Sequence, residues 1–129
     1  MAREILFKAK RIDNGEWVYG NYAFTDTNGE QHFIFQNKAF EHEVDKDTIC
    51  QYTGMDDNNG NKIWENDIVE CKSLDYHFQS QIEWDSSCCG FMFQDTKNSA
   101  VGLDAISVCG CYRKFEIIGN IFDNKELLE

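Results

Sequence analysis

The residues best suited to metal or redox chemistry are the cysteines, because a thiolate binds soft metals and attacks electrophiles. There are six, namely Cys50, Cys71, Cys88, Cys89, Cys109 and Cys111. The pairs Cys88-Cys89 and Cys109-x-Cys111 should fall on neighbouring strands and would supply four ligands to tetrahedral zinc. Adjacent cysteines in a strand point to opposite faces, so this spacing chelates poorly. Three interpretations stay open for these thiols: a zinc site, an adventitious disulfide, or free thiols packed as small core side chains.

The histidines are scattered along the chain at His32, His42 and His77. None has an H-x-x-H, H-E-x-x-H or Cys-His spacing, and the chain has no P-loop, Rossmann glycine motif or nucleophile elbow. His42 stands between two glutamates, which is typical of a surface residue. We therefore expect no catalytic residues, no cofactor and no enzyme, with a thiol- or metal-dependent enzyme as the weaker alternative.

The segment "EHEVDKD" places a carboxylate at every second position. In an extended strand, Glu41, Glu43, Asp45 and Asp47 would line one face. Calcium loops need a glycine at a sharp turn and a bidentate glutamate at a fixed distance, and this segment has neither. The row is therefore interpreted either as a solvated strand edge that discourages aggregation or as a strip that docks on a basic partner.

The overall charge limits the classes of partner. The chain has 129 residues and a formal net charge of −11, from 12 Lys and Arg against 23 Asp and Glu. Such a surface repels phosphate backbones and anionic lipid, so direct nucleic-acid or membrane binding is disfavoured. The opening residues contain only a short apolar run, Ile5 to Phe7, and no stretch is long enough to cross a membrane. We expect a cytoplasmic protein, in which free thiols are the default.

Turn residues define the expected strands. Asn-Gly pairs, which suit the positive φ angles of tight hairpin turns, occur at residues 14–15, 28–29 and 59–60. The first two predict a three-stranded antiparallel meander over about residues 3–36. Short apolar runs at intervals of roughly eight to twelve residues then predict an all-β sandwich or small barrel. Ile63, Ile68 and Val69 are core candidates, Asn66-Asp67 a tight bend, and Asn124 the cap of one short C-terminal helical turn.

Three segments together resemble a known family. "REILFKAKR" opens the chain, "QYTGMDDNNGNKIWENDIVE" spans residues 51–70, and "FEIIGNIFDNKELL" closes it. In this order they resemble the YopX family of phage and prophage proteins. The resemblance implies a mostly β protein encoded in phage-derived DNA, with the central and C-terminal strands forming an SH3-like barrel. It implies a setting rather than an activity, and segments 12–44 and 71–112 carry no part of it.

The resulting predictions are specific. Residues 1–48 should form the N-terminal antiparallel meander with a linker, and residues 49–129 the SH3-like barrel with its C-terminal turn. The expected role is that of a small phage- or prophage-derived β protein, in the cytoplasm of its host, that acts through protein contacts or self-association. The alternative is an acidic anti-host effector or nucleic-acid mimic that docks on a basic DNA-binding protein.

Overall fold

Antiparallel strands make up nearly all of the regular structure. The computed structural model describes residues 4–37, 40–72, 77–87, 89–94, 100–102 and 114–128. Two compact units divide the chain at Gly54/Met55. The strands form two sheets, with the orders β4-β3-β2-β1-β5-β6 and β10-β9-β8-β7-β11.

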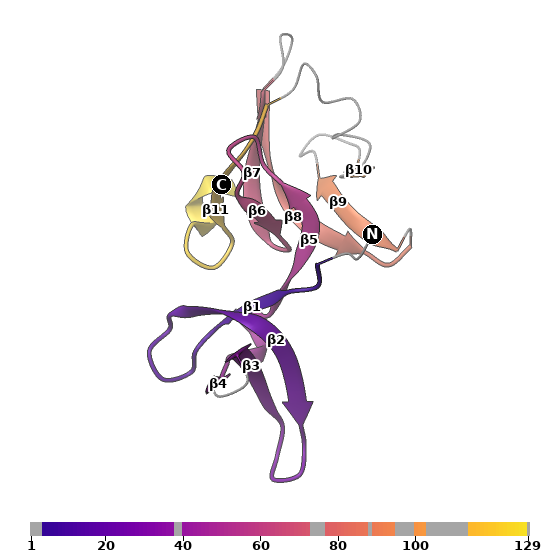
Figure 1. Cartoon of the computed structure of the whole chain (residues 1–129). Helices are drawn as coiled ribbons and strands as arrows, with labels where there is room; N and C mark the ends of the chain where they lie inside the picture. The colour runs from indigo at the N-terminus through magenta and orange to yellow at the C-terminus, as the bar shows by residue number, and fades with distance from the viewer. Residues whose placement is uncertain are drawn as a thin grey trace. The chain divides into compact units, whose positions relative to one another are not determined.

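The first unit, Met1–Gly54, is built from a meander and the strand that follows it (Figure 1). Its elements are β1 (Phe7–Lys10), β2 (Trp17–Thr25), β3 (Gln31–Asn37), β4 (Phe40–Glu43), the 3-10 turn η1 (Lys46–Thr48) and β5 (Cys50–Asp56), which runs on past Gly54. The predicted hairpins are confirmed: Gly15 and Gly29 adopt φ angles of 73° and 93° in the two connections. The predicted linker region contains β4 and η1.

Four strands of this unit curl around a small core. One fully buried side chain comes from each of β1, β2 and β3 and one from the residue after β4, namely Ala9, Val18, Ile34 and Val44. An isolated antiparallel bridge joins Val44 to Arg11, so the end of β4 returns to the end of β1. The curl is tight at Gly20, because a Cβ built there would lie 2.0 Å from the Phe35 carbonyl oxygen. A glycine is therefore required at this position.

The second unit, Met55–Glu129, contains the third Asn-Gly turn near its start. It contains β6 (Lys62–Trp64), β7 (Asp67–Lys72), β8 (His77–Asp85), β9 (Gly90–Gln94), β10 (Ala100–Gly102), β11 (Lys114–Asn120) and the 3-10 turn η3 (Lys125–Leu128). The predicted core residues Ile63, Ile68 and Val69 are 2%, 0% and 0% exposed. Because Ile68 and Val69 are neighbours, β7 is covered on both of its faces.

The mostly β prediction and the short C-terminal helical turn are confirmed. The barrel is where prediction and structure differ: among the described strands, β10, β9, β8, β7 and β11 form an open sheet with β10 and β11 at its two ends, while β6 lies beside β5 in the other sheet. The apolar runs determined which segments became strands, but closure depends on how the end strands pair, and their side-chain pattern does not encode that. Asn124 also differs from expectation, since its Oδ1 accepts from the Asn120 amide at 3.2 Å, on the side away from η3.

Candidate functional site

An open hollow lies at one end of the curled sheet of the first unit. Its volume is about 410 Å³, within the range of ligand sites. Its walls come from the end of β1 and the following turn, the start of β3, and the segment that leads from β4 into η1. The lining residues are Lys10, Arg11, Ile12, Gly15, Glu30, His32, Glu43, Val44, Asp45 and Lys46.

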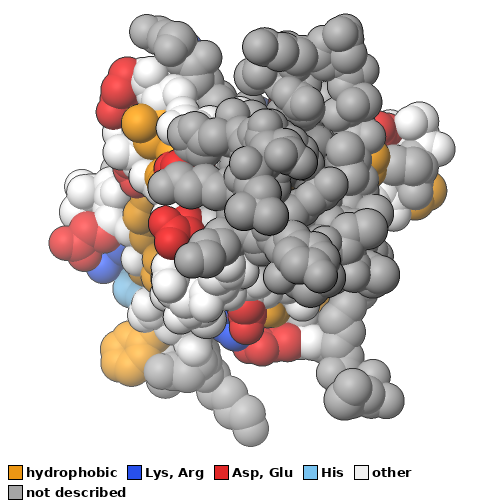
Figure 2. All heavy atoms as spheres, turned by 90° about the horizontal axis from the view of Figure 1, so that it is seen from above, with side chains coloured by type: hydrophobic (Ala, Val, Ile, Leu, Met, Phe, Trp, Pro, Cys, Tyr) orange, Lys and Arg blue, Asp and Glu red, His pale blue; other side chains and the backbone are white. Residues whose placement is uncertain are grey.

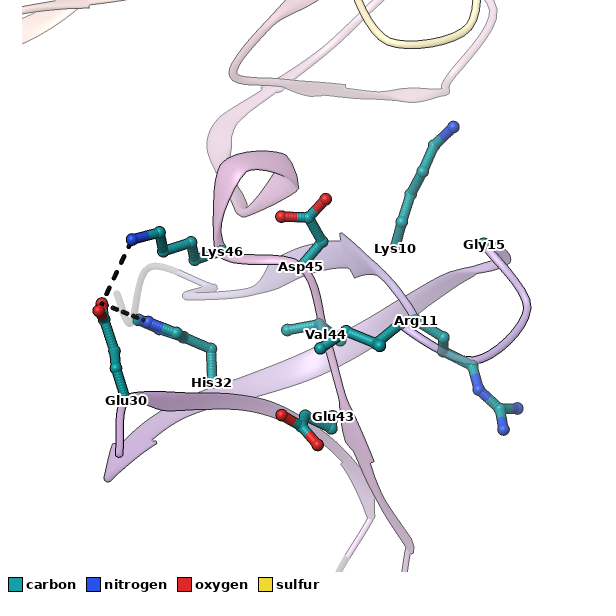
Figure 3. Close-up of a pocket in the computed structure, with 10 residues that line it drawn as sticks. Lys10, Arg11, Gly15, Glu30, His32, Glu43, Val44, Asp45 and Lys46 are labelled. Atoms are coloured by element: carbon teal, nitrogen blue, oxygen red, sulfur yellow. Dashed lines mark hydrogen bonds and ion pairs between the residues drawn. The ribbon is translucent and has the colours of Figure 1, made fainter. Parts of the chain in front are cut away.

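A chain of polar contacts crosses one wall of this hollow. The His32 ring lies between the Tyr22 hydroxyl, 2.6 Å from Nδ1, and a Glu30 carboxylate oxygen, 2.9 Å from Nε2. A carboxylate only accepts, so Nε2 carries a proton, and in the neutral ring Nδ1 accepts from Tyr22. Lys46 Nζ lies 3.6 Å from the other Glu30 oxygen. Figure 3 shows Glu30 joined to both His32 and Lys46.

The electrostatics of this network follow from its contacts. The hydrogen bond from His32, and next the charge of Lys46, hold the pKa of Glu30 below its usual value. Burial, and next the negative charge of Glu30, raise the pKa of the Tyr22 phenol. The Tyr22 and His32 rings are stacked, with centroids 5.8 Å apart. The network is therefore a neutral phenol and an imidazole held beside an ionised carboxylate.

The remaining charges of the hollow divide into paired and unpaired groups. Arg11 Nε donates to Asp13 at 2.9 Å, and Figure 3 shows its guanidinium pointing away from the Glu30 network. Glu43 and Asp45 line the hollow on either side of Val44. Neither carboxylate has a Lys, Arg or His partner within 4 Å among the residues described. Lys10 also lines the hollow, and its Nζ lies 5.4 Å from the centroid of the Trp17 ring. Glu43 and Asp45 are therefore the lining carboxylates that have no cation beside them among the residues described.

The acidic row has a different shape from the one predicted. Glu41 and Glu43 lie on β4, but the chain turns at Asp45, whose Oδ1 accepts from the Asp47 amide at 3.0 Å and caps η1. The four carboxylates therefore do not share one extended strand, because the cap bends the backbone between the two pairs. All four side chains are exposed. We refer to Glu41, Glu43, Asp45 and Asp47 as the acidic edge.

In the described part of the first unit, Cys50 and His42 do not line the hollow. Cys50 is buried and Cys89 exposed, both as free thiols, while Cys88, Cys109 and Cys111 lie outside the described residues. In the part of the chain that is described, no group of three or more His, Cys, Asp or Glu is placed to hold a metal ion. The zinc hypothesis therefore stays untested. His42 Nε2 lies 3.1 Å from Gln36 Oε1.

The Tyr22–His32 pair was not singled out from the sequence, although a signal for it exists. The predicted hairpin around Asn28-Gly29 fixes the register, in which Phe24 faces His32 and Tyr22 faces Ile34. Tyr22 and His32 then lie diagonally on the same face of the sheet, within reach of each other. Counting the register back from the turn would have found the pair.

The motif-rich stretch 51–70 forms backbone geometry rather than a reactive site. Asp57, 7% exposed, accepts from the amides of Asn59 and Asn61, both at 2.9 Å, and from the Ile117 amide at 3.2 Å. Asn66 has φ 70°, the left-handed conformation expected of this residue. Its backbone N–H donates to Ile82 O and its carbonyl accepts from Ile121. These two residues fasten the turns before β6 and β7 to distant strands.

The family model described as YopX protein matches residues 6–129. The chain belongs to the YopX family. The resemblance found in three segments of this YopX family member thus extends over nearly the whole sequence, including segments 12–44 and 71–112.

One solved structure has the same fold as this YopX family member. The crystal structure of protein EF1440 from Enterococcus faecalis matches it with a TM-score of 0.58 and 22% sequence identity, covering 99% of this chain and 100% of that one. At this identity the likeness concerns the fold alone. None of the curated proteins matches the chain.

Proposed function

We propose that this YopX family member acts by binding a basic protein along the acidic edge. The observation that carries the proposal is the lack of compensation: the four carboxylates are exposed, and no cation among the described residues lies within ion-pair distance of them. Acidic side chains are also present at several other places on the surface (Figure 2). Complementary charge on two proteins raises their association rate and disfavours partners of the wrong charge.

The backbone of β4 adds a second point of attachment. Val44 N–H donates toward β3, to His32 O at 2.9 Å, while Glu43 O accepts from Ile12 on the opposite side. By alternation, the N–H and C=O of Glu41 also point away from β3. Because Ile12 occupies the Glu43 end of this edge, an extended basic segment would pair at Glu41 and place its cations beside Glu41 and Glu43.

A second copy of the chain fits the same edge less well. Antiparallel pairing of two β4 strands would bring the exposed carboxylates of Glu41 and Glu43 against their equivalents. Like charges directly opposite one another destabilise a strand pair. A basic partner is therefore favoured over self-association at β4. Charged residues on an edge strand also oppose aggregation.

The proposed setting is the cytoplasm of a bacterial host that carries phage or prophage DNA. Family membership supports this setting. The partner class with the required basic surface is a DNA-binding protein of the host. The acidic edge would bind the surface of that protein that otherwise contacts DNA phosphates. No helix in the described part of the chain is long and apolar enough to cross a membrane.

The test compares two variants with the same change in net charge. E41Q/E43Q/D45N/D47N neutralises the edge, and the amide that replaces the Asp45 carboxylate keeps an oxygen that can cap η1. The control, E16Q/D26N/E83Q/E116Q, neutralises four exposed carboxylates elsewhere. Each protein is immobilised on resin and incubated with bacterial lysate at 0.1 M and at 1 M salt. We expect the wild type and the control to capture basic proteins at 0.1 M salt. The edge variant should not capture them, and at 1 M salt none of the three proteins should. Equal capture by both variants would refute the proposal, and light scattering would show whether the captured species is a second copy.

A further inference from the structure

The hollow beside the acidic edge has a composition that suits one kind of group. Its exposed apolar side chain is Ile12, which is 59% exposed, while the Val44 side chain is 1% exposed and packs into the core. The two carboxylates without a cation, Glu43 and Asp45, line the hollow on either side of Val44. A long basic side chain has an apolar stem and a charged head, and such side chains commonly lay the stem on apolar surface while the head meets polar groups.

We propose that the hollow receives a single lysine or arginine side chain from the basic partner, with its methylene stem along Ile12 and its cationic head against Glu43 or Asp45. This inference rests on the proposed function, and it names the contact that fixes the partner in register on β4. The hollow is continuous with the acidic edge, because Glu43 and Asp45 belong to both. An anchor here would position the extended segment beside Glu41.

The other charges of the hollow are consistent with this occupant. Lys46 and His32 both contact Glu30, and Arg11 contacts Asp13. The third lysine or arginine on the walls, Lys10, has its Nζ 5.4 Å from the centroid of the Trp17 ring, so each of these cations is engaged by a neighbour. An anionic ligand would have to displace those neighbours, while a cationic one meets Glu43 and Asp45 directly. Both carboxylates stay partly hydrated, so we expect a weak individual contact that works together with the rest of the edge.

The probe is a blocked tripeptide, acetyl-Gly-Arg-Gly-amide, titrated to millimolar concentration into the ¹⁵N-labelled full chain and followed by amide chemical shifts. Acetyl-Gly-Lys-Gly-amide is the second cationic probe, and the citrulline peptide is the neutral match to arginine. We expect saturable shifts confined to residues 12, 30 and 43–46 with one or both cationic peptides. The citrulline peptide should give none.

Three variants locate the contact. E43Q/D45N should weaken peptide binding at least fivefold, and Ile12→Ser, at an exposed position, should weaken it while leaving the spectrum otherwise unchanged. The control E16Q/D26N should bind like wild type. Shifts that spread over all acidic surfaces, equal shifts with citrulline, or undiminished binding by E43Q/D45N would overturn the inference.

The peptide titration tests the anchor in the hollow, and the lysate capture tests the proposed function, so each can be refuted without the other. If the edge variant loses its basic partner but no cationic peptide gives localised shifts, the proposed function stands and the anchor in the hollow does not. If the peptide binds at residues 43–46 but the edge variant still captures every partner, the hollow binds cations and the proposed function is wrong.

Discussion

Replacing Asp57 by alanine should destabilise the second unit by about 2–5 kcal/mol. The substitution removes three amide hydrogen bonds to one carboxylate that is 7% exposed. Asn59 and Asn61 are exposed, so water can replace the carboxylate at their amides, and each loss costs roughly 0.5–1 kcal/mol. The amide of Ile117 is half-buried, and leaving it without an acceptor costs about 1–3 kcal/mol more.

The substitution Asp57→Asn removes the negative charge of the side chain and keeps its size and shape. The asparagine keeps one acceptor oxygen, but its NH₂ group would face an amide donor, so at least one of the three bonds is lost. We expect a smaller loss than for alanine, about 1–3 kcal/mol.

The effect should also depend on pH. Burial alone would raise the pKa of Asp57, but the amides of Asn61, Ile117 and Asn59 hold the pKa below the ordinary 3.8. A carboxyl group with a lowered folded-state pKa stabilises the protein above its unfolded-state pKa, and that contribution is lost as pH falls through the folded-state value. The difference between wild type and Asp57→Asn should therefore be constant near neutral pH and shrink below about pH 4.

The assay is urea unfolding between pH 2.5 and 7, with hydrogen exchange at the Ile117 amide as a local readout. Glu116→Gln is the control, because it removes one charge from an exposed neighbour on β11. It should change the free energy of unfolding by less than about 0.5 kcal/mol. If Asp57→Ala unfolds as the control does, or if the wild-type advantage grows on acidification, the hydrogen-bond account of this residue is wrong.

Three further changes test other parts of the fold. Asn66→Ala should unfold at lower urea than Asn66→Gly, by about 1–2 kcal/mol, because alanine is strained at φ 70°; the opposite order would contradict the backbone argument. Gly20→Ala should destabilise the first unit by more than about 3 kcal/mol, since its Cβ would clash with the β3 backbone. A Cβ at Gly29 meets no atom within 4 Å, so Gly29→Ala should cost only the strain of alanine at a positive φ angle. Equal losses of stability in circular-dichroism melts of the two variants would count against the tight curl at Gly20. Tyr22→Phe should lower the free energy of unfolding by about 0.5–1.5 kcal/mol, because it removes the 2.6 Å contact with His32; an unchanged free energy would show that this contact does not stabilise the fold.

Local sequence rules predicted the strands well because the relevant forces are local. Asn-Gly turns and alternating apolar residues determine where β1, β2 and β3 begin and end, and the buried Ile68 and Val69 followed from a short apolar run. The open sheet could not be predicted in this way. Strand pairing across long separations depends on which edges meet, and segments with similar apolar patterns can pair in more than one order.

The candidate site shows the same division. The acidic edge was visible in the sequence as alternating carboxylates, but its bend at Asp45 was not, because an aspartate in an extended run and an aspartate that caps a turn look alike. The hollow depends on the bridge between Arg11 and Val44, residues that lie far apart along the chain. No spacing rule within a short window can bring these two residues together.

The contact between Asp57 and Ile117 spans 60 residues, and this separation has a consequence during synthesis. At about 5–20 residues per second, β11 leaves the ribosome roughly 3–12 s after the turn that it will hold. Throughout this interval β7 lacks one of its two partner strands, and the unpaired edge is open to other nascent chains. If synthesis stopped before residue 114, β7 would keep its unpaired edge. The sheet is therefore completed, and its edge protected from aggregation, only when translation reaches β11.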